Sequence, residues 1–355
     1  MKKILYIAKK YSYGKPENGL SYEYYNFFNT LKQMPEYKII YFPFDEIMIS
    51  SGKEFMNREL IDVFLKESPE YCFFILSHDE IDKKTIKEIS KHKTKTINFF
   101  GDDTFRFHYF SRYYAPLFHW ICTAYHEVLP LYKKIGVTNI IETQFAVNHH
   151  LYKPENIKRD IDVSFVGRFH RGREKIIRKL KKAGINVYCR GPGWPDGHIS
   201  QEDMVRIFSR SKINLNLSNT GFFMGSFRGL IGIFFRKGGL FGIRTNTLRV
   251  TREGFRRYFF GSPEQIKGRN FEVPACRGFL ITSDASNLRE YYEDGKEIVI
   301  FNNVNDLIKK IKYYLKYEVE RETIAEAGYL RTIQDHTYEK RLRRIFEIID
   351  GTSVV

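Results

Sequence analysis

The stretch KGRNFEVPACRGFLITSDASNLREYYEDGKE, residues 267–297, predicts a loop, a short helix, a buried strand and a second helix in close succession. The first helix is expected to start near Asn270 and to end at Gly278, because glycine readily adopts the backbone conformation that closes a helix. The apolar run at residues 279–282 is typical of a buried strand. This succession indicates an αβ unit of an α/β protein.

Charged residues lie at the junctions of this unit. Lys267 and Arg269 precede the helix, where positive side chains and free backbone N–H groups together favour an anion such as phosphate. Glu272 falls in the first turn, where a carboxylate is favoured and can accept hydrogen bonds from ligand hydroxyls. The alternative is an ordinary αβ unit whose charges are solvated, and the spacing alone leaves both interpretations open.

The longer segment RNFEVPACRGFLITSDASNLREYYEDGKEIVIF, residues 269–301, resembles the signature of the CgeB-like, spore-maturation-type glycosyltransferases, which are related to group-1 nucleotide-sugar transferases. The resemblance implies an α/β fold of the GT-B type, with two Rossmann-like domains that face a central cleft and a final helix that crosses back to the first domain. It also implies that the C-terminal domain holds most of the donor. The characteristic residues of the family pattern correspond to Lys267, Arg269 and Glu272.

Length and charge suggest two domains and an anionic partner. The chain has 355 residues, more than single cores usually support. We expect an N-terminal domain at 1–155, a C-terminal domain at 156–335 and a last helix at 336–355. The formal net charge of +16 favours a nucleotide diphosphate, a nucleic acid, a phosphorylated glycan or an anionic lipid surface.

The cysteines and the apolar runs indicate a cytoplasmic protein. The four cysteines are far apart in sequence, which argues against a zinc site or a disulfide framework. The N-terminal apolar run is too short for a signal peptide, and no uncharged run approaches the ~20 residues that span a bilayer. We expect reduced, buried thiols at Cys72, Cys122, Cys189 and Cys276.

The N-terminal half opens like a Rossmann-like unit. A strand at residues 3–8 is followed by a glycine loop and a helix, but Gly14 and Gly19 do not match the dinucleotide fingerprint. In GT-B transferases this loop faces the cleft, so both glycines are candidates for the acceptor side; a plain tight turn is the alternative. His78 follows the buried strand 71–76, at the edge where open α/β sheets bind ligands, and is a third acceptor-side candidate.

Two adjacent carboxylates follow the strand at residues 96–100. Asp102 and Asp103 could each bind an acceptor hydroxyl or take its proton, and they are the candidate catalytic acids or bases of this half. Because adjacent side chains of an extended chain point in opposite directions, only one of them is expected to face a ligand. The alternative is a helix N-cap at either position.

The second domain opens with a strand at 162–167, a glycine and a cluster of cations. Gly167 and Arg168 match a Gly-Arg pair that approaches the donor diphosphate in group-1 transferases, and Arg173 lies at the start of the next helix. Gly191 and Trp194 follow the next strand. Trp194 is expected either to stack on the nucleobase or to pack beneath its loop.

A basic, aromatic and glycine-rich insertion follows at 221–265. It is too polar to span a membrane, but its charge suits peripheral contact with anionic lipid, a phosphorylated acceptor or single-stranded nucleic acid. The plain alternative is a basic loop that covers the cleft.

The preferred hypothesis is transfer of a sugar from a nucleotide-diphosphate donor to a hydroxyl of a glycan, lipid-linked or cell-surface acceptor. Arg168, Lys267 and Arg269 would stabilise the leaving diphosphate, with Asn270 at the helix start assisting. The chain has no D-x-D motif of the metal-dependent type, so activity without a metal or other cofactor is expected. The rival is a non-catalytic protein on the same scaffold that binds nucleic acid or another anionic polymer.

Overall fold

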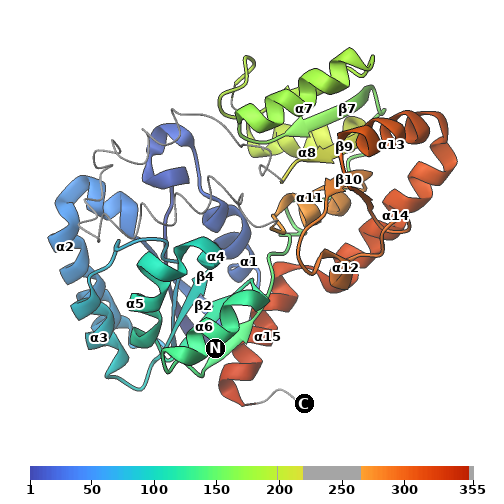
Figure 1. Cartoon of the computed structure of the whole chain (residues 1–355). Helices are drawn as coiled ribbons and strands as arrows, with labels where there is room; N and C mark the ends of the chain where they lie inside the picture. The colour runs from blue at the N-terminus through green and yellow to red at the C-terminus, as the bar shows by residue number, and fades with distance from the viewer. Residues whose placement is uncertain (198, 219–264, 352–355) are drawn as a thin grey trace. The chain divides into compact units, whose positions relative to one another are not determined.

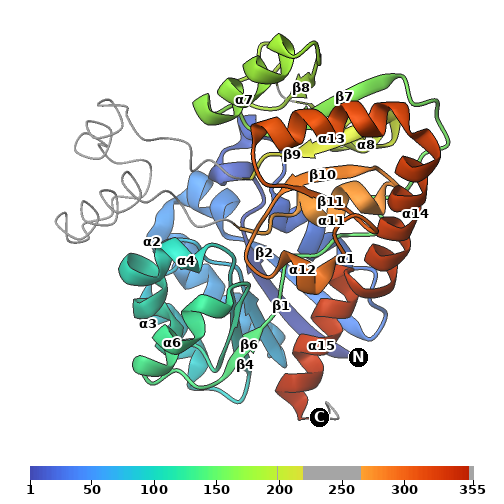
Figure 2. The same ribbon diagram turned by 45° about the vertical axis from the view of Figure 1, so that its right-hand side comes forward.

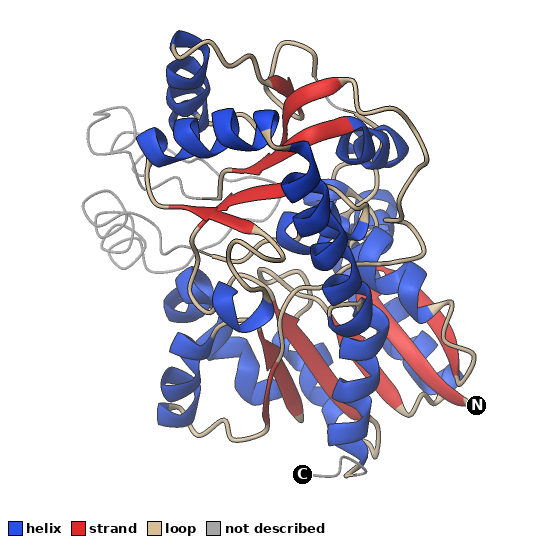
Figure 3. Cartoon of the chain, turned by 90° about the vertical axis from the view of Figure 1, so that its right-hand side faces the viewer, coloured by secondary structure: helices blue, strands red, loops and turns tan. Residues whose placement is uncertain are grey.

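The computed structural model describes the chain except for residues 198, 219–264 and 352–355, and its contacts divide the chain into two compact units. The N-terminal unit comprises residues 1–144 and the last helix, α15 (Tyr338–Asp350); the C-terminal unit comprises the described residues of 145–337. Each unit contains one parallel sheet with helices packed around it, so the predicted α/β class is confirmed (Figures 1 and 3).

The N-terminal unit is built on a six-stranded parallel sheet of order β2-β1-β3-β4-β5-β6. Its central strands are nearly continuous apolar runs, as expected for strands covered on both faces. The strands are β1 (Lys2–Ala8), β2 (Tyr37–Pro43), β3 (Tyr71–Phe74), β4 (Lys95–Phe100), β5 (Trp120–Thr123) and β6 (Ile140–Glu142). The α-helices of residues 1–144 are α1 (Asn29–Leu31), α2 (Phe44–Glu67), α3 (Lys83–Ser90), α4 (Asp103–Arg106), α5 (Arg112–Tyr114) and α6 (Leu129–Lys134).

Helix α15 packs on the N-terminal unit through aromatic side chains. The ring of Phe346 lies 4.9 Å from that of Tyr37 and 4.8 Å from that of Tyr71, and the ring of Tyr338 lies 4.4 Å from that of Phe27. The Tyr71 hydroxyl donates to Asp350 Oδ1 at 2.5 Å. The last helix of the chain therefore returns to the first sheet, beside β1 (Figure 2), as the GT-B resemblance implies.

The C-terminal unit contains a five-stranded parallel sheet of order β11-β10-β9-β7-β8. The strands are β7 (Ile161–Val166), β8 (Tyr188–Arg190), β9 (Ser211–Asn216), β10 (Leu280–Ser283) and β11 (Val299–Phe301). The helices are α7 (Arg171–Lys182), α8 (Gln201–Arg210), α11 (Arg269–Ala275), α12 (Leu288–Tyr291), α13 (Val304–Lys316) and α14 (Glu318–Asp335). Leu280 and Ile281 belong to separate apolar clusters because successive strand residues face opposite sides of the sheet.

The two sheets share one topological property. In each, the first strand of the unit lies between two later strands: β1 is flanked by β2 and β3, and β7 by β8 and β9. The chain thus changes direction across the sheet at β1/β3 and at β7/β9. Open α/β sheets bind ligands outside the carboxyl ends of the strands at such a switch point.

Candidate functional site

The carboxyl ends of β7 and β9 carry two anchored guanidinium groups. Arg269 donates from Nε to the carbonyl of Val166, the last residue of β7, at 3.2 Å. Arg173 donates from Nε to the carbonyl of Leu217, just after β9, at 2.9 Å, and from Nη1 to the carbonyl of Arg168 at 2.7 Å. The structure therefore brings together three of the predicted cations, Arg168, Arg173 and Arg269, at the switch point of the C-terminal sheet.

Glu272 is a buried partner of Arg269. Its side chain has no exposed surface, whereas that of Arg269 is 27% exposed, and the two form an ion pair. The other carboxylate oxygen, Oε1, accepts a hydrogen bond from the Tyr152 hydroxyl at 3.0 Å. In this geometry Glu272 holds the guanidinium in place instead of facing a ligand's hydroxyls, which differs from the sequence expectation.

Lys267 and Asn270 form the turn that leads into α11. The Asn270 side chain is buried; its Oδ1 accepts from the backbone N–H of Lys267 at 3.0 Å and from Asn216 at 3.0 Å. Its amide donates to Thr282 at 3.2 Å. Asn270 therefore connects α11 to β9 and β10, while Lys267 is half-buried and contacts Gln265.

The end of α11 differs from the expectation that Gly278 closes it. Arg277 adopts the left-handed conformation, with φ of 52°, and its N–H donates to the carbonyl of Pro274 at 2.8 Å. Gly278 follows and donates to the carbonyl of Val273 at 3.0 Å, which completes the Schellman arrangement. A Cβ at Gly278 would come within 2.9 Å of Asn214 Nδ2 and of Val273, so this glycine permits close packing against β9.

The loops after β7 and β8 interlock. Gly167 donates its N–H to the carbonyl of Arg190 at 2.9 Å, and a Cβ at Gly191 would lie only 2.5 Å from the Gly167 carbonyl oxygen. Trp194 is buried and donates its indole N–H to that same carbonyl at 2.9 Å. Of the two interpretations of Trp194, the geometry matches packing beneath the loop. Gly167, Gly191 and Trp194 thus fix the loop that carries Arg168.

The glycine loop of the N-terminal unit is tied to α2. Gly14 and Gly19 both have positive φ, 67° and 75°, which explains glycine at these turns. The buried Asp45 carboxylate accepts from the backbone N–H groups of Lys10 and Tyr11, at 2.7 and 2.9 Å. The tight-turn interpretation is therefore sufficient for the two glycines.

Asp102 and Asp103 have different environments, but not through the alternation of an extended chain, because Asp103 is the first residue of α4. Asp103 is fully buried and accepts from the Tyr132 hydroxyl at 2.8 Å; burial raises the pKa of its carboxyl to about 7. The Asp102 side chain is 38% exposed, and its Oδ2 lies 3.9 Å from Arg106 Nη2. Asp102 occupies the N-cap position of α4 without a capping hydrogen bond from its side chain. Of the two carboxylates, only Asp102 is accessible to a ligand in this structure.

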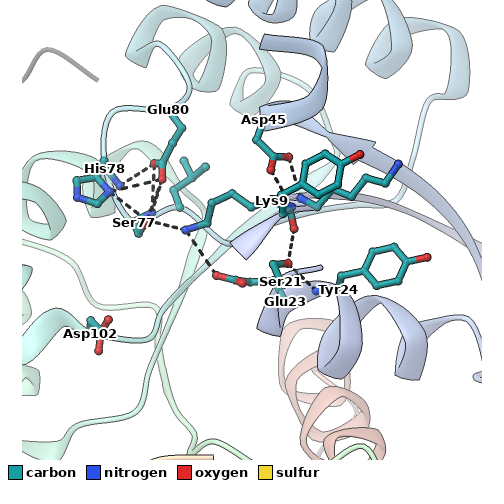
Figure 4. A network of polar contacts seen from close by, with 12 residues as sticks. Lys9, Ser21, Glu23, Tyr24, Asp45, Ser77, His78, Glu80 and Asp102 are labelled. Atoms are coloured by element: carbon teal, nitrogen blue, oxygen red, sulfur yellow. Dashed lines mark hydrogen bonds and ion pairs between the residues drawn. The ribbon is translucent and has the colours of Figure 1, made fainter. Parts of the chain in front are cut away.

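A polar network fills the switch point of the N-terminal sheet (Figure 4). Lys9, directly after β1, donates to Ser77 Oγ at 3.1 Å and lies 3.7 Å from the Glu23 carboxylate. Ser77 and the predicted His78 follow β3 and surround the buried Glu80. Sequence analysis missed Lys9 and Glu80. Lys9 directly follows the apolar strand 3–8, and that position at a strand's carboxyl end could have identified it.

The remaining expectations concern thiols, membrane contact and the insertion. The four cysteines are free thiols; Cys72, Cys122 and Cys276 are buried and Cys189 is half-buried. Among the described residues, no helix combines the length and apolar character needed to cross a bilayer. The basic insertion lies outside the described residues except for Gln265, so its predicted contacts with membrane or nucleic acid remain predictions.

Comparisons with known proteins agree with this architecture. Residues 171–229 and 244–347 match a family model described as glycosyl transferase-like. Sucrose-phosphate synthase from Thermosynechococcus elongatus has a TM-score of 0.62 at 9% identity, covering 99% of this chain and 100% of that one. A glycosyltransferase from Rickettsia africae has a TM-score of 0.60 at 12% identity, covering 99% of both chains.

Anabaena HepE in complex with UDP-glucose has a TM-score of 0.61 at 10% identity, covering 99% of this chain and 100% of that one. A search of curated proteins gives no match. The predicted CgeB-like subfamily stays a prediction. The chain has the GT-B fold of these glycosyltransferases, and its residues 171–229 and 244–347 match the glycosyl transferase-like family model.

Proposed function

We propose that the protein transfers a sugar from a nucleoside-diphosphate sugar to an acceptor hydroxyl. The proposal rests on two guanidinium groups, those of Arg269 and Arg173, which backbone carbonyls hold at the switch point of the C-terminal sheet. This is the sheet edge at which the fold binds ligands, and guanidinium groups match phosphate oxygens in charge and geometry. HepE, which shares the fold, has been crystallised with UDP-glucose, and this supports a nucleotide sugar as donor.

The chemistry requires stabilisation of a leaving group. As the bond from the anomeric carbon to the diphosphate oxygen breaks, negative charge accumulates on the diphosphate and the sugar becomes oxocarbenium-like. Cations that are already fixed in place stabilise this charge more as it develops, which lowers the barrier. Arg269, fixed by Glu272, would supply this charge together with Arg168 and Lys267.

A divalent metal is not part of this proposal, because the cationic side chains would neutralise the diphosphate themselves. The acceptor would be a glycan or lipid-linked hydroxyl, with Asp102 as the accessible carboxylate on the acceptor side. Activity that EDTA abolishes and Mn²⁺ restores would contradict the metal-independent mechanism.

A thermal-shift screen against nucleotide sugars tests the proposal. A ligand that binds only the folded protein raises its melting temperature according to ligand concentration and Kd. We expect one nucleotide sugar to raise the melting temperature of the wild type and not that of an Arg269→Ala variant. Steep salt-dependent binding of oligonucleotides, with no response to any nucleotide sugar, would contradict it and favour the polymer-binding rival.

A further inference from the structure

Two helices of the C-terminal unit, α7 and α13, cover the same face of its sheet and contact one another. Ile176 and Leu180 of α7 are buried in one apolar cluster together with Leu307 and Ile311 of α13. Because the apolar side of each helix faces this cluster, the opposite sides of the two helices adjoin on the outside of the unit. We call these sides the α7/α13 surface; both helices are labelled in Figure 1.

The α7/α13 surface is strongly cationic. Helix α7 contains seven Lys or Arg residues and one carboxylate, Glu174, whereas α13 contains four Lys residues and one carboxylate, Asp306. Both carboxylates lie beside cations of their own helix: Asp306 is 2.9 Å from Lys310, and Glu174 is 3.8 Å from Arg178. Six of the seven cations of α7 are exposed, and the exposed cations of α13 are Lys309, Lys312 and Lys316.

Neighbouring cations on α7 repel one another. Arg171, Lys175 and Lys179 follow at intervals of four residues, and Arg178 and Lys182 repeat this spacing. Side chains four residues apart are neighbours on a helix, and like charges at this spacing destabilise it. The helix dipole favours cations only in the last turn. An anionic surface that lies against α7 relieves the repulsion that remains.

We infer that the α7/α13 surface docks on an anionic phospholipid bilayer. Four to eight Lys or Arg residues on one amphipathic helix are typical of segments that bind acidic lipid headgroups. The cations are spread over two neighbouring helices, ~18 and ~20 Å long, and so match a two-dimensional array of headgroups. A nucleic-acid strand, in contrast, presents its phosphates along one line.

An aromatic side chain within this surface also suits a membrane. Tyr313 is 44% exposed and lies one turn from Lys309 and one turn from Lys316, on the same side of α13. Tyrosine is enriched where a membrane meets water, because its ring is apolar and its hydroxyl is polar. The exposed part of α13 therefore combines positive charge with an aromatic ring that can lie at the level of the headgroups.

Co-sedimentation of the full chain with vesicles tests the inference. We expect binding to vesicles of phosphatidylcholine and phosphatidylglycerol in equal parts, and little binding to phosphatidylcholine alone. High salt should release the protein, because salt screens charges at a surface. One Lys close to an anionic membrane strengthens binding roughly fivefold. The combined variant Lys179→Gln, Lys181→Gln and Lys182→Gln should therefore bind roughly 100-fold more weakly.

Two further variants locate the surface that binds. The combined variant Lys309→Gln, Lys312→Gln and Lys316→Gln should also lose vesicle binding, although its substitutions lie on the other helix. The matched control removes three exposed lysines of the N-terminal unit, Lys84, Lys87 and Lys93, and should bind vesicles like the wild type. Because all these side chains are exposed, urea unfolding should show that each variant is folded.

Three outcomes would overturn the inference. The first is a wild type that does not bind the anionic vesicles. The second is an equal loss of binding in the control variant, which would indicate a general charge effect. The third is unchanged binding in both helix variants, which would assign the contact to another part of the chain, such as the basic insertion at 221–265.

A parallel titration with a single-stranded oligonucleotide separates lipid from nucleic acid. Oligonucleotide binding that the helix variants lose, in a wild type that ignores vesicles, would assign the α7/α13 surface to nucleic acid and overturn the inference. Neither assay uses a nucleotide sugar, so the result does not depend on the proposed function.

Discussion

The two switch points of this molecule have the same topology and opposite chemistry. Among the described residues, the β7/β9 edge has two guanidinium groups held by backbone carbonyls, those of Arg173 and Arg269, and the buried Glu272 carboxylate pairs with Arg269. At β1/β3 the positive charge of Lys9 is largely balanced by Glu23 and Glu80, and the partly exposed His78 side chain lies beside Glu80. The first edge is cationic, whereas the charges of Lys9, Glu23 and Glu80 at the second edge largely cancel.

The fold supplies the position of each site, while short loops after the strands supply its chemistry. A net positive edge stabilises charge that develops in the transition state. Under the proposed function, a balanced edge would not compete with the cationic edge for the diphosphate.

The largest expected effect is on the stability of the fold. Two buried carboxyl groups of the N-terminal unit, those of Glu80 and Asp103, should change this stability with opposite dependence on pH. The pKa of Glu80 is lowered to about 2, so its ionised form stabilises the fold above its unfolded pKa and this contribution is lost as pH falls towards 2. The pKa of Asp103 is raised by burial to about 7, so its ionisation opposes folding as pH rises from about 4 to 7.

Glu80→Gln should therefore lower the free energy of unfolding by about 3 kcal/mol at pH 7, and the loss should shrink below pH 4.5. Asp103→Asn should become more stable relative to the wild type as pH rises, by up to about 4 kcal/mol at pH 7. Urea unfolding between pH 3 and 8 measures both. If the unfolding free energies of the two variants, relative to the wild type, changed with pH in the same direction, the two pKa shifts would be contradicted.

The second-largest effect is on nucleotide-sugar affinity at the cationic edge, the carboxyl ends of β7 and β9. Loss of the charged hydrogen bonds of Arg269 to a diphosphate, each contributing about 1.5–3 kcal/mol, should weaken nucleotide-sugar binding roughly 10- to 100-fold. Because Arg269→Ala alone leaves Glu272 buried without its ion pair, the double variant with Glu272→Gln should recover stability but not binding. Isothermal titration calorimetry measures the affinity.

Arg277→Ala is the matched control for Arg269. Arg277 lies just after the same helix, is half exposed and pairs with Glu326 at 2.7 Å. The Arg277→Ala variant should bind the nucleotide sugar with the affinity of the wild type. Equal losses in the two arginine variants would indicate a general charge effect and not a site at β7/β9.

The sequence allowed much of the fold to be predicted because its signals are local. Apolar runs of strand length and the helix starts placed most strands, and the loops after them located Arg168, Arg269 and His78 near sheet edges. Burial could not be predicted in the same way. Glu272, Asn270 and Asp103 are polar residues that only tertiary neighbours render inaccessible, and sequence spacing says nothing of Tyr152 or Tyr132.

A smaller effect tests how Glu272 is held. Tyr152 is buried, and its hydroxyl donates to Glu272 Oε1, so Tyr152→Phe leaves a buried carboxylate oxygen without that partner. We expect a loss of about 1–3 kcal/mol in unfolding free energy, measured by urea denaturation. Tyr313→Phe is the control, because the Tyr313 hydroxyl donates to Glu320 at 2.8 Å on the exposed surface and should cost little. Equal losses of unfolding free energy in Tyr152→Phe and Tyr313→Phe would mean that the burial of Glu272 does not cause the loss.

The smallest effect distinguishes the two interpretations of Trp194. In the structure its indole N–H holds the Gly167 carbonyl and its ring lies against Phe165 and Phe169, with centroids 6.0 and 5.1 Å away. Trp194→Phe keeps an aromatic ring and removes one hydrogen bond, so stability should fall by about 1 kcal/mol and donor affinity should stay within a few-fold of the wild type. Trp120→Phe, in the other unit, serves as the fluorescence control. A loss of donor affinity well beyond tenfold would instead favour stacking on the nucleobase, and would mean that the loop rearranges when the donor binds.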